Sequence, residues 1–149
     1  MPPATLVVVD MQNMFEAASD PNTVIGVAHE ILQAKERNGG IILLEYEDCG
    51  RTHKGYSLLL KGYRRKSRIT KGDDDGSVEV VRAARRRCFN LDHLRVCGVN
   101  ADCCVVSTVL GLLGHLRESR IEVVKNACGW NARKFTWDKY PKHNNLYLV

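Results

Sequence analysis

The chain has 149 residues, which is enough for one domain with a buried core and short for two. Its 44% hydrophobic and 26% charged residues exclude an intrinsically disordered chain. The net charge of +5 is compatible with an anionic partner. No apolar run approaches the roughly 20 residues of a membrane span. We therefore expect a single domain over residues 1–149 with no membrane association. Without a secretory leader, its expected location is cytoplasmic.

Six cysteines occur without a C-x-x-C pair or the spacing of a zinc site. This pattern favours reduced thiols in a reducing compartment. Cys88, Cys97 and Cys128 are expected to be buried small hydrophobes. The adjacent pair Cys103-Cys104 differs from them, because it stands where a predicted strand passes into a predicted helix.

Apolar runs alternate with helical periodicities along the chain. Helices are predicted from Pro21 to the stop at Gly39-Gly40, in a short stretch around 57–60, over Val78 to Ala84, and from the cysteine pair to Leu116. Strands are predicted at 5–9, 41–45, 67–70, 94–99, 121–124 and 146–149. This alternation predicts an α/β fold, a three-layer α/β/α Rossmann-like domain with a mainly parallel sheet of five to six strands.

Three reactive side chains come at the ends of predicted strands: Asp10, Lys71 and the cysteine pair. Ligands of open α/β sheets bind beyond the carboxyl ends of the strands, so these groups are expected to share one crevice. A carboxylate, an ammonium group and a thiol supply a base, a charge that stabilises a thiolate, and a nucleophile. A thiol in the first turn of a helix also lies near unpaired N–H groups, which predicts a lowered thiol pKa.

The segment from Val7 to Phe15 resembles the first-strand motif of the isochorismatase-like cysteine hydrolases, the superfamily of nicotinamidases and N-carbamoylsarcosine amidases. The run from Gly98 to Thr108 resembles the nucleophile motif of that superfamily, and Lys71 stands between the two as the lysine of the family does. The three motifs occur in the family order and cover roughly residues 4–128.

The resemblance assigns the nucleophile to Cys104 and implies that Cys103 points away. Asp10 would take the thiol proton, and Lys71 would hold the anionic pair together. The resemblance further implies a cis peptide bond between Val99 and Asn100, with the N–H groups of Asn100 and Cys104 as the oxyanion hole. The implied reaction is cleavage of a small amide or carbamoyl C–N bond through a thioester.

Gln12 and Phe15 are expected to line the substrate pocket. The expected partner is a small-molecule substrate, and family resemblance with a short chain predicts a homo-oligomer. Nicotinamidases carry an Asp-x-His-x-x-His metal site after the second strand, where this chain has Glu45, Glu47 and one histidine, His53. Because an open zinc site usually has three protein ligands, we expect no metal and no other cofactor.

A second function class remains open, a non-catalytic binding module on the same fold. Basic residues gather around Tyr63 and again near the end of a predicted helix: Lys61, Arg64, Arg65, Lys66, Arg68, Lys71, and Arg82, Arg85, Arg86, Arg87. Such a patch can hold an anionic partner or nucleic acid. Charge runs usually face water, so nucleic-acid binding is the less favoured expectation.

Overall fold

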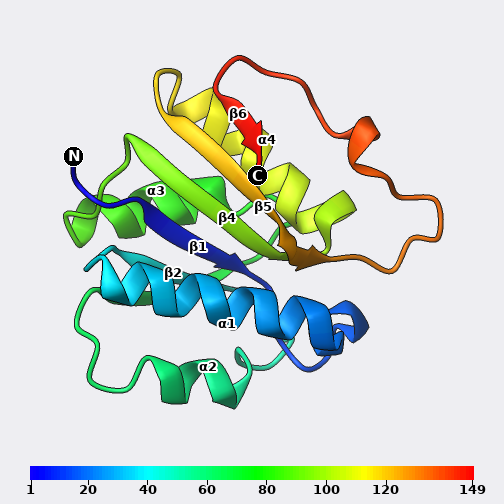
Figure 1. The fold of residues 1–149 in the computed structure, drawn as a ribbon, viewed down its shortest axis with the longest axis horizontal. Coiled ribbons are helices and arrows are strands. Elements are labelled where there is room, and N and C mark those ends of the chain that lie inside the picture. The colour runs from blue at the N-terminus through cyan, green and yellow to red at the C-terminus, as the bar shows by residue number, and fades with distance from the viewer.

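Six parallel strands form one sheet in the computed structural model, which describes residues 1–149 (Figure 1). Their order is β3-β2-β1-β4-β5-β6. The strands are β1 Thr5–Val9, β2 Ile41–Tyr46, β3 Lys66–Lys71, β4 His93–Val99, β5 Arg120–Gly129 and β6 Leu146–Leu148.

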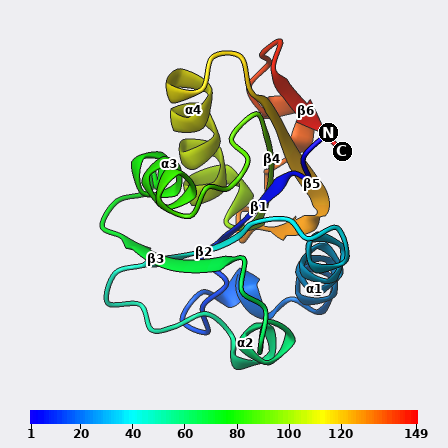
Figure 2. The same ribbon diagram turned by 90° about the vertical axis from the view of Figure 1, so that its left-hand side faces the viewer.

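Helices cover both faces of this sheet (Figure 2). α1 (Pro21–Glu36) and α2 (Lys54–Leu59) lie on one face, and α3 (Ser77–Arg86) and α4 (Val106–His115) lie on the other. Three short helical turns complete the chain: η1 Glu16–Ser19, η2 Ala101–Val105, which is a π-helical turn, and η3 Trp137–Lys139. The predicted three-layer α/β/α class with a parallel sheet is therefore confirmed. No helix of the protein combines the length and apolar character needed to cross a bilayer.

The central strands owe their place to continuous apolar sequence. All five residues of β1 are buried, and so are the first five of β2, because helices cover both sides of them. β3 lies at the edge of the sheet, and its residues are buried less deeply until Lys71. This explains why the apolar signal of β3 is the weaker one in the sequence.

The winding of the sheet reverses between β1 and β4. The chain passes from β1 outward to β2 and β3, returns to β4, and continues outward in the other direction to β5 and β6. The carboxyl ends of β1 and β4 therefore flank the topological switch point, where open α/β sheets bind ligands. Asp10 follows β1 directly, and η2 follows β4.

Several predicted boundaries differ from the structure by one to a few residues, and two of these differences bear on the site. β5 continues to Gly129 instead of ending at 124, because the pairing of β4 with β5 shifts register between Val96 and Gly98. The helix that begins near the cysteine pair starts with the η2 turn, and regular α-helix begins only at Val106.

Candidate active site

Asp10 and Lys71 form a buried ion pair at the carboxyl edge of the sheet. The Lys71 Nζ atom lies 3.2 Å from Asp10 Oδ2, and each residue is only 1% exposed. Lys71 ends β3, so its side chain must pass across β2 to reach Asp10. On this path its Nζ lies 3.9 Å from the centroid of the Tyr46 ring, and it also donates to the Asp73 carbonyl. The sheet thus brings together two of the three residues predicted from the sequence.

The Asp10 carboxylate has few partners for so deep a position. Neither of its oxygens has a hydrogen bond of good geometry, so Lys71 compensates its charge without saturating it. Burial raises the pKa of Asp10, and interactions with Cys104 and Lys71 oppose this rise. The backbone φ of Asp10 is 51°, in the left-handed region that non-glycine residues adopt at strained positions. A carboxylate with a raised pKa and free lone pairs is suited to accept a proton.

Gly98 of β4 packs directly against Val9 of β1 at the point where the chain leads on to Cys104. A Cβ atom on Gly98 would lie 2.1 Å from the Val9 carbonyl oxygen, and Gly98 has a φ of 119°, so only glycine fits there. The peptide bond that follows, between Val99 and Asn100, is cis. The η2 turn then places Cys104 beside Asp10, with 7% of the residue exposed.

The pKa of the Cys104 thiol is raised, which makes the predicted lowering wrong. Burial is the main cause, the neighbouring Asp10 carboxylate adds to it, and the Lys71 charge opposes both. The N–H groups at the helix start favour the thiolate, but the depth of the site and the nearby Asp10 carboxylate outweigh them. The thiol therefore keeps its proton at neutral pH until a base removes it.

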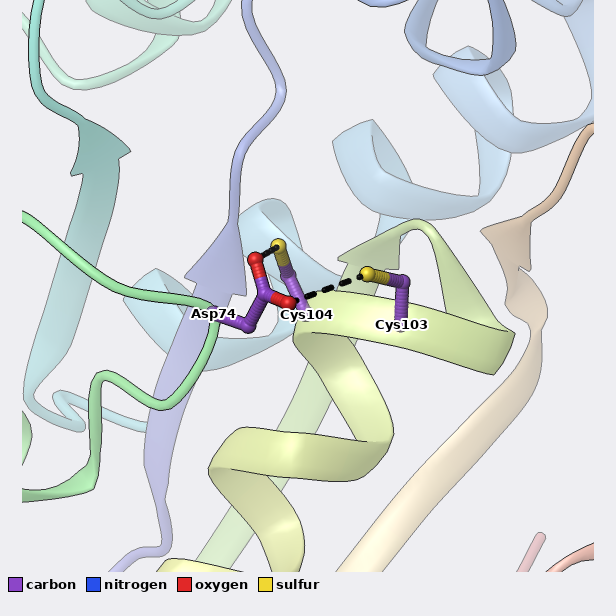
Figure 3. A group of neighbouring side chains, drawn as sticks. All are labelled: Asp74, Cys103 and Cys104. Carbon is purple, nitrogen blue, oxygen red and sulfur yellow. Dashed lines mark hydrogen bonds between the residues drawn. The ribbon is translucent and has the colours of Figure 1, made fainter.

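Asp74 contacts both thiols of the cysteine pair, and no motif in the sequence distinguishes it from its two neighbouring aspartates. The Cys103 thiol donates to Asp74 Oδ2 over 3.6 Å and the Cys104 thiol to Oδ1 over 3.7 Å (Figure 3). The Tyr46 hydroxyl donates to the same carboxylate over 3.4 Å. Cys103 consequently does not point away, as the resemblance implied, because it shares Asp74 with Cys104.

The loop that carries Asp74 is fixed to α4. The Thr108 hydroxyl accepts from the Gly76 N–H at 3.0 Å and donates to the Asp74 carbonyl at 3.3 Å. Asp75, the next residue, accepts from the Ser77 N–H at 2.8 Å at the start of α3. Of three successive aspartates, one therefore accepts the first N–H of α3, while another faces the thiols.

Gln12 and Phe15 have different surroundings. Gln12 is fully buried, and its amide bonds the N–H and carbonyl of Tyr46 and the Gly50 carbonyl at 2.7–3.0 Å. Its polar atoms are engaged in holding the Tyr46 backbone. Phe15 is half-buried, with its ring centroid 6.4 Å from that of Tyr46, and Tyr46 in turn contacts Lys71.

Asn100 and Cys104 are the residues whose backbone N–H groups were predicted to form the oxyanion hole. The Asn100 carbonyl accepts from the N–H groups of Cys103 and Val105 at 3.0 and 3.1 Å, which shapes the η2 turn. The side chain of Asn100 places a buried Oδ1 atom without a hydrogen-bond partner next to this turn.

The residues after β2 do not fit the metal site of nicotinamidases. Glu45 Oε2 accepts from the N–H and hydroxyl of Thr52 at 2.5 and 2.8 Å and pairs with Arg68 Nε at 3.4 Å. His53 Nε2 lies 2.9 Å from the Ala18 carbonyl. These donors have protein partners and face different neighbours. The donor atoms that do converge are those of Asp74, Cys103 and Cys104, all within 4.8 Å of one another.

No family model matches the sequence, and no curated protein matches it. Solved structures do match the fold. The nicotinamidase from Staphylococcus aureus superposes with a TM-score of 0.75 at 20% identity, over 90% of this chain and 88% of its own. The N-carbamoylsarcosine amidase from Thermoplasma acidophilum gives a TM-score of 0.75 at 19% identity, over 97% and 94%.

A third similar structure has a different activity in its name. The MAR1 ribonuclease from Caenorhabditis elegans superposes with a TM-score of 0.73 at 19% identity, over 89% of this chain and 68% of its own. The chain thus has the fold of the isochorismatase-like proteins, and the resemblance noted in the sequence is confirmed at the level of the fold.

Proposed function

We propose that the protein is a metal-independent cysteine hydrolase of the isochorismatase-like superfamily, which cleaves a C–N bond of a small amide or carbamoyl compound. The observation that carries this proposal is the buried pair of Asp10 and Lys71 at 3.2 Å beside the Cys104 thiol. A buried carboxylate whose lone pairs are free costs stability, and such costs are typical of sites that perform chemistry.

In the first step, Asp10 removes the proton from Cys104 as the sulfur attacks the carbonyl carbon. A C–S bond forms, and the carbonyl electron pair moves onto the oxygen, which the N–H groups of Asn100 and Cys104 would stabilise. Lys71 keeps its charge beside the thiolate, which lowers the free energy of the charged intermediate. Proton transfer to Asp10 is needed because the thiol pKa is raised in the free protein.

In the second step, the C–N bond breaks as the oxyanion collapses, and the protonated Asp10 returns its proton to the departing nitrogen. The thioester on Cys104 remains. Asp10, again a carboxylate, takes a proton from water, whose oxygen attacks the thioester carbon. The C–S bond breaks, the acid product leaves, and Cys104 regains a proton.

Phe15, Tyr46 and Asp74 are half-buried and form a continuous row of contacts that ends at the Cys104 thiol, so we assign the substrate pocket to the space beside this row. Gln12 holds Tyr46 in this arrangement through its three amide contacts. Homo-oligomerisation and a cytoplasmic location stay predictions from the sequence.

The test is a screen of small amides, ureides and nicotinamide with detection of the acyl-enzyme by intact-protein mass spectrometry. We expect one substrate class to add an acyl group to the wild-type protein and to Cys88→Ala, since Cys88 is exposed and lies outside the site. Cys104→Ala is expected to give no adduct. An adduct mapped to Cys103 would refute the assignment.

A second candidate function has its own observation, a basic patch made of Lys61, Arg64, Arg65, Lys66, Arg82, Arg85, Arg86 and Arg87. None of these eight forms an ion pair, since the ion pairs of the structure involve other residues. Arg65 and Arg87 both lie over the Phe89 ring, at 5.3 and 5.8 Å, which joins the two basic segments. Its residues precede β3 or belong to the C-terminal half and end of α3, so the patch lies toward the edge where strands begin, opposite Asp10, Lys71 and Cys104.

A non-catalytic module that binds an anionic polymer would use this patch. That two similar structures are named ribonucleases makes single-stranded RNA the partner to test. Binding measured by fluorescence anisotropy should weaken with salt and weaken further in Arg85→Gln/Arg86→Gln, both exposed positions. If the variant binds RNA as tightly as the wild type does, the basic patch is not the RNA-binding surface.

A further inference from the structure

Asp74 is a half-buried carboxylate with thiol partners and no cation. No lysine, arginine or histidine forms an ion pair with it, and the nearby Lys71 charge is balanced by Asp10. Its two oxygens instead face the sulfur atoms of Cys103 and Cys104, one each (Figure 3). An anionic group placed between two thiols can be neutralised by a ligand that binds all three.

The spacing of these donors is that of ligands around one metal ion. Zinc binds sulfur at about 2.3 Å and carboxylate oxygen at about 2.1 Å, so adjacent sulfur and oxygen ligands of a tetrahedral site lie about 3.6 Å apart. The Cys103 sulfur lies 3.6 Å from Asp74 Oδ2 and the Cys104 sulfur lies 3.7 Å from Asp74 Oδ1, so each thiol has this spacing to a different carboxylate oxygen. With one donor atom taken from each residue, the three atoms lie within 4.8 Å of one another.

The donors are also held in place before any ion arrives. Cys103 and Cys104 belong to the η2 turn, and the Asp74 loop is tied to the following helix by both hydrogen bonds of Thr108. Two thiols with one carboxylate select thiophilic divalent ions over magnesium or calcium, which prefer oxygen ligands alone. Three protein ligands leave a fourth position open to solvent or substrate.

We propose that Asp74, Cys103 and Cys104 bind one thiophilic divalent cation of the zinc type, which covers the Cys104 sulfur. Each thiol loses its proton to solvent as its sulfur binds the ion, so two protons leave for each cation bound. The consequence for catalysis rests on the proposed function: the bound ion withdraws electron density from the Cys104 sulfur and covers it, so the thiolate becomes a weaker nucleophile and the cation inhibits the hydrolase reversibly. In this arrangement Cys103 has a role that the hydrolase mechanism does not give it.

The test is a titration of the full chain with Cd²⁺, followed by the ultraviolet charge-transfer band of cadmium thiolate. The background is Cys49→Ala/Cys88→Ala, which removes the accessible thiols outside the cluster, since Cys97 and Cys128 are buried. We expect one Cd²⁺ per chain and the release of two protons. Zn²⁺ is expected to compete for the same site.

Cys103→Ala and, as a conservative second variant, Asp74→Asn should each weaken Cd²⁺ binding at least about tenfold while circular dichroism shows the same fold. Equal affinity in both variants, or loss of the band in the Cys49→Ala/Cys88→Ala background, would overturn the proposal. Because the titration needs no turnover, a cadmium site without any hydrolase activity would contradict the proposed function alone.

Discussion

Two groups of buried carboxylates lie toward opposite edges of the sheet, and they differ in how well their oxygens are hydrogen-bonded. At the edge where strands begin, Arg95 binds both oxygens of Glu30 at 2.9 and 3.0 Å and Glu122 at 2.5 Å. Arg120 binds the other oxygen of Glu122 at 2.7 Å. At the edge where strands end, Asp10 has Lys71 at 3.2 Å and no well-formed hydrogen bond.

Because of this difference, the pKa values of the two buried carboxyl groups shift in opposite directions. Burial alone would raise the pKa of Glu122, but hydrogen bonds from Arg120, His93 and Arg95 outweigh it and lower the pKa. For Asp10, burial outweighs its interactions and the pKa rises. The same kind of residue thus stabilises the fold where donors are plentiful and remains available for proton transfer where they are few.

Replacing the poorly hydrogen-bonded carboxylate, Asp10, is expected to have the largest effect. The variant is Asp10→Asn, and the quantity that changes is activity. An amide cannot accept the thiol proton, so kcat should fall about a thousandfold for whichever substrate the screen identifies. Steady-state kinetics on protein with unchanged circular dichroism measures it. A loss of less than tenfold would remove Asp10 from the role of base.

Gly98→Ala is expected to destabilise the fold at the edge of the sheet where Asp10, Lys71 and Cys104 lie, because it strains the backbone of β4. Its Cβ would meet the Val9 carbonyl, and its φ of 119° disfavours any side chain, so the free energy of unfolding should fall by about 3 to 5 kcal/mol. Urea denaturation measures this loss. Gly114→Ala is the matched control, because no atom lies within 4 Å of the Cβ position there, and since alanine favours a helix more than glycine does, it should be neutral or stabilising by up to about 1 kcal/mol.

Arg95→Met is expected to affect stability without affecting the site. It leaves Glu30 without its partner, and since the Arg95 side chain is partly exposed, the loss should be about 2 to 3 kcal/mol. Alkylation of Cys104 by iodoacetamide should keep its wild-type pH dependence in this variant. A shifted dependence would mean that the two edges are coupled.

The smallest effect is expected from Glu122→Gln, which should change how the free energy of unfolding depends on pH in acid. Its folded pKa is lowered, so the stability that it contributes is present above its unfolded pKa of about 4.5 and is lost as pH falls through the folded value. Glu122→Gln should therefore lose less unfolding free energy than the wild type between pH 5 and acid conditions of about pH 2. Parallel curves for the two proteins would contradict this assignment.

Much of the fold was predictable because its signals are local. β1 and β2 are apolar throughout, since both of their faces are buried, and Asp20 caps α1 through the Thr23 N–H at 2.9 Å as its place before Pro21 predicts. The ends of β1 and β3 locate Asp10 and Lys71 because parallel strands end at one edge.

The remaining features depend on distances across the fold that no local pattern contains. Three adjacent aspartates look alike in the sequence, and only the packing of α4 selects Asp74 to face the thiols. Cys88 was expected to be buried but is exposed, because it follows the end of α3 with a φ of 53°. The pKa of Cys104 likewise depends on how deeply η2 packs against Asp10.

The central claim is that Asp10 serves Cys104 as its base, and site-resolved alkylation tests it most directly. Iodoacetamide rates at each cysteine, mapped by peptide mass spectrometry across pH, should place the midpoint for Cys104 above the ordinary thiol value of 9.0 in the wild type. In Asp10→Asn the midpoint should move downward, because the carboxylate that raises the thiol pKa is gone while Lys71 stays, and Cys88 should not change. A Cys104 midpoint below 9.0 in the wild type, or one that Asp10→Asn leaves in place, would contradict the account.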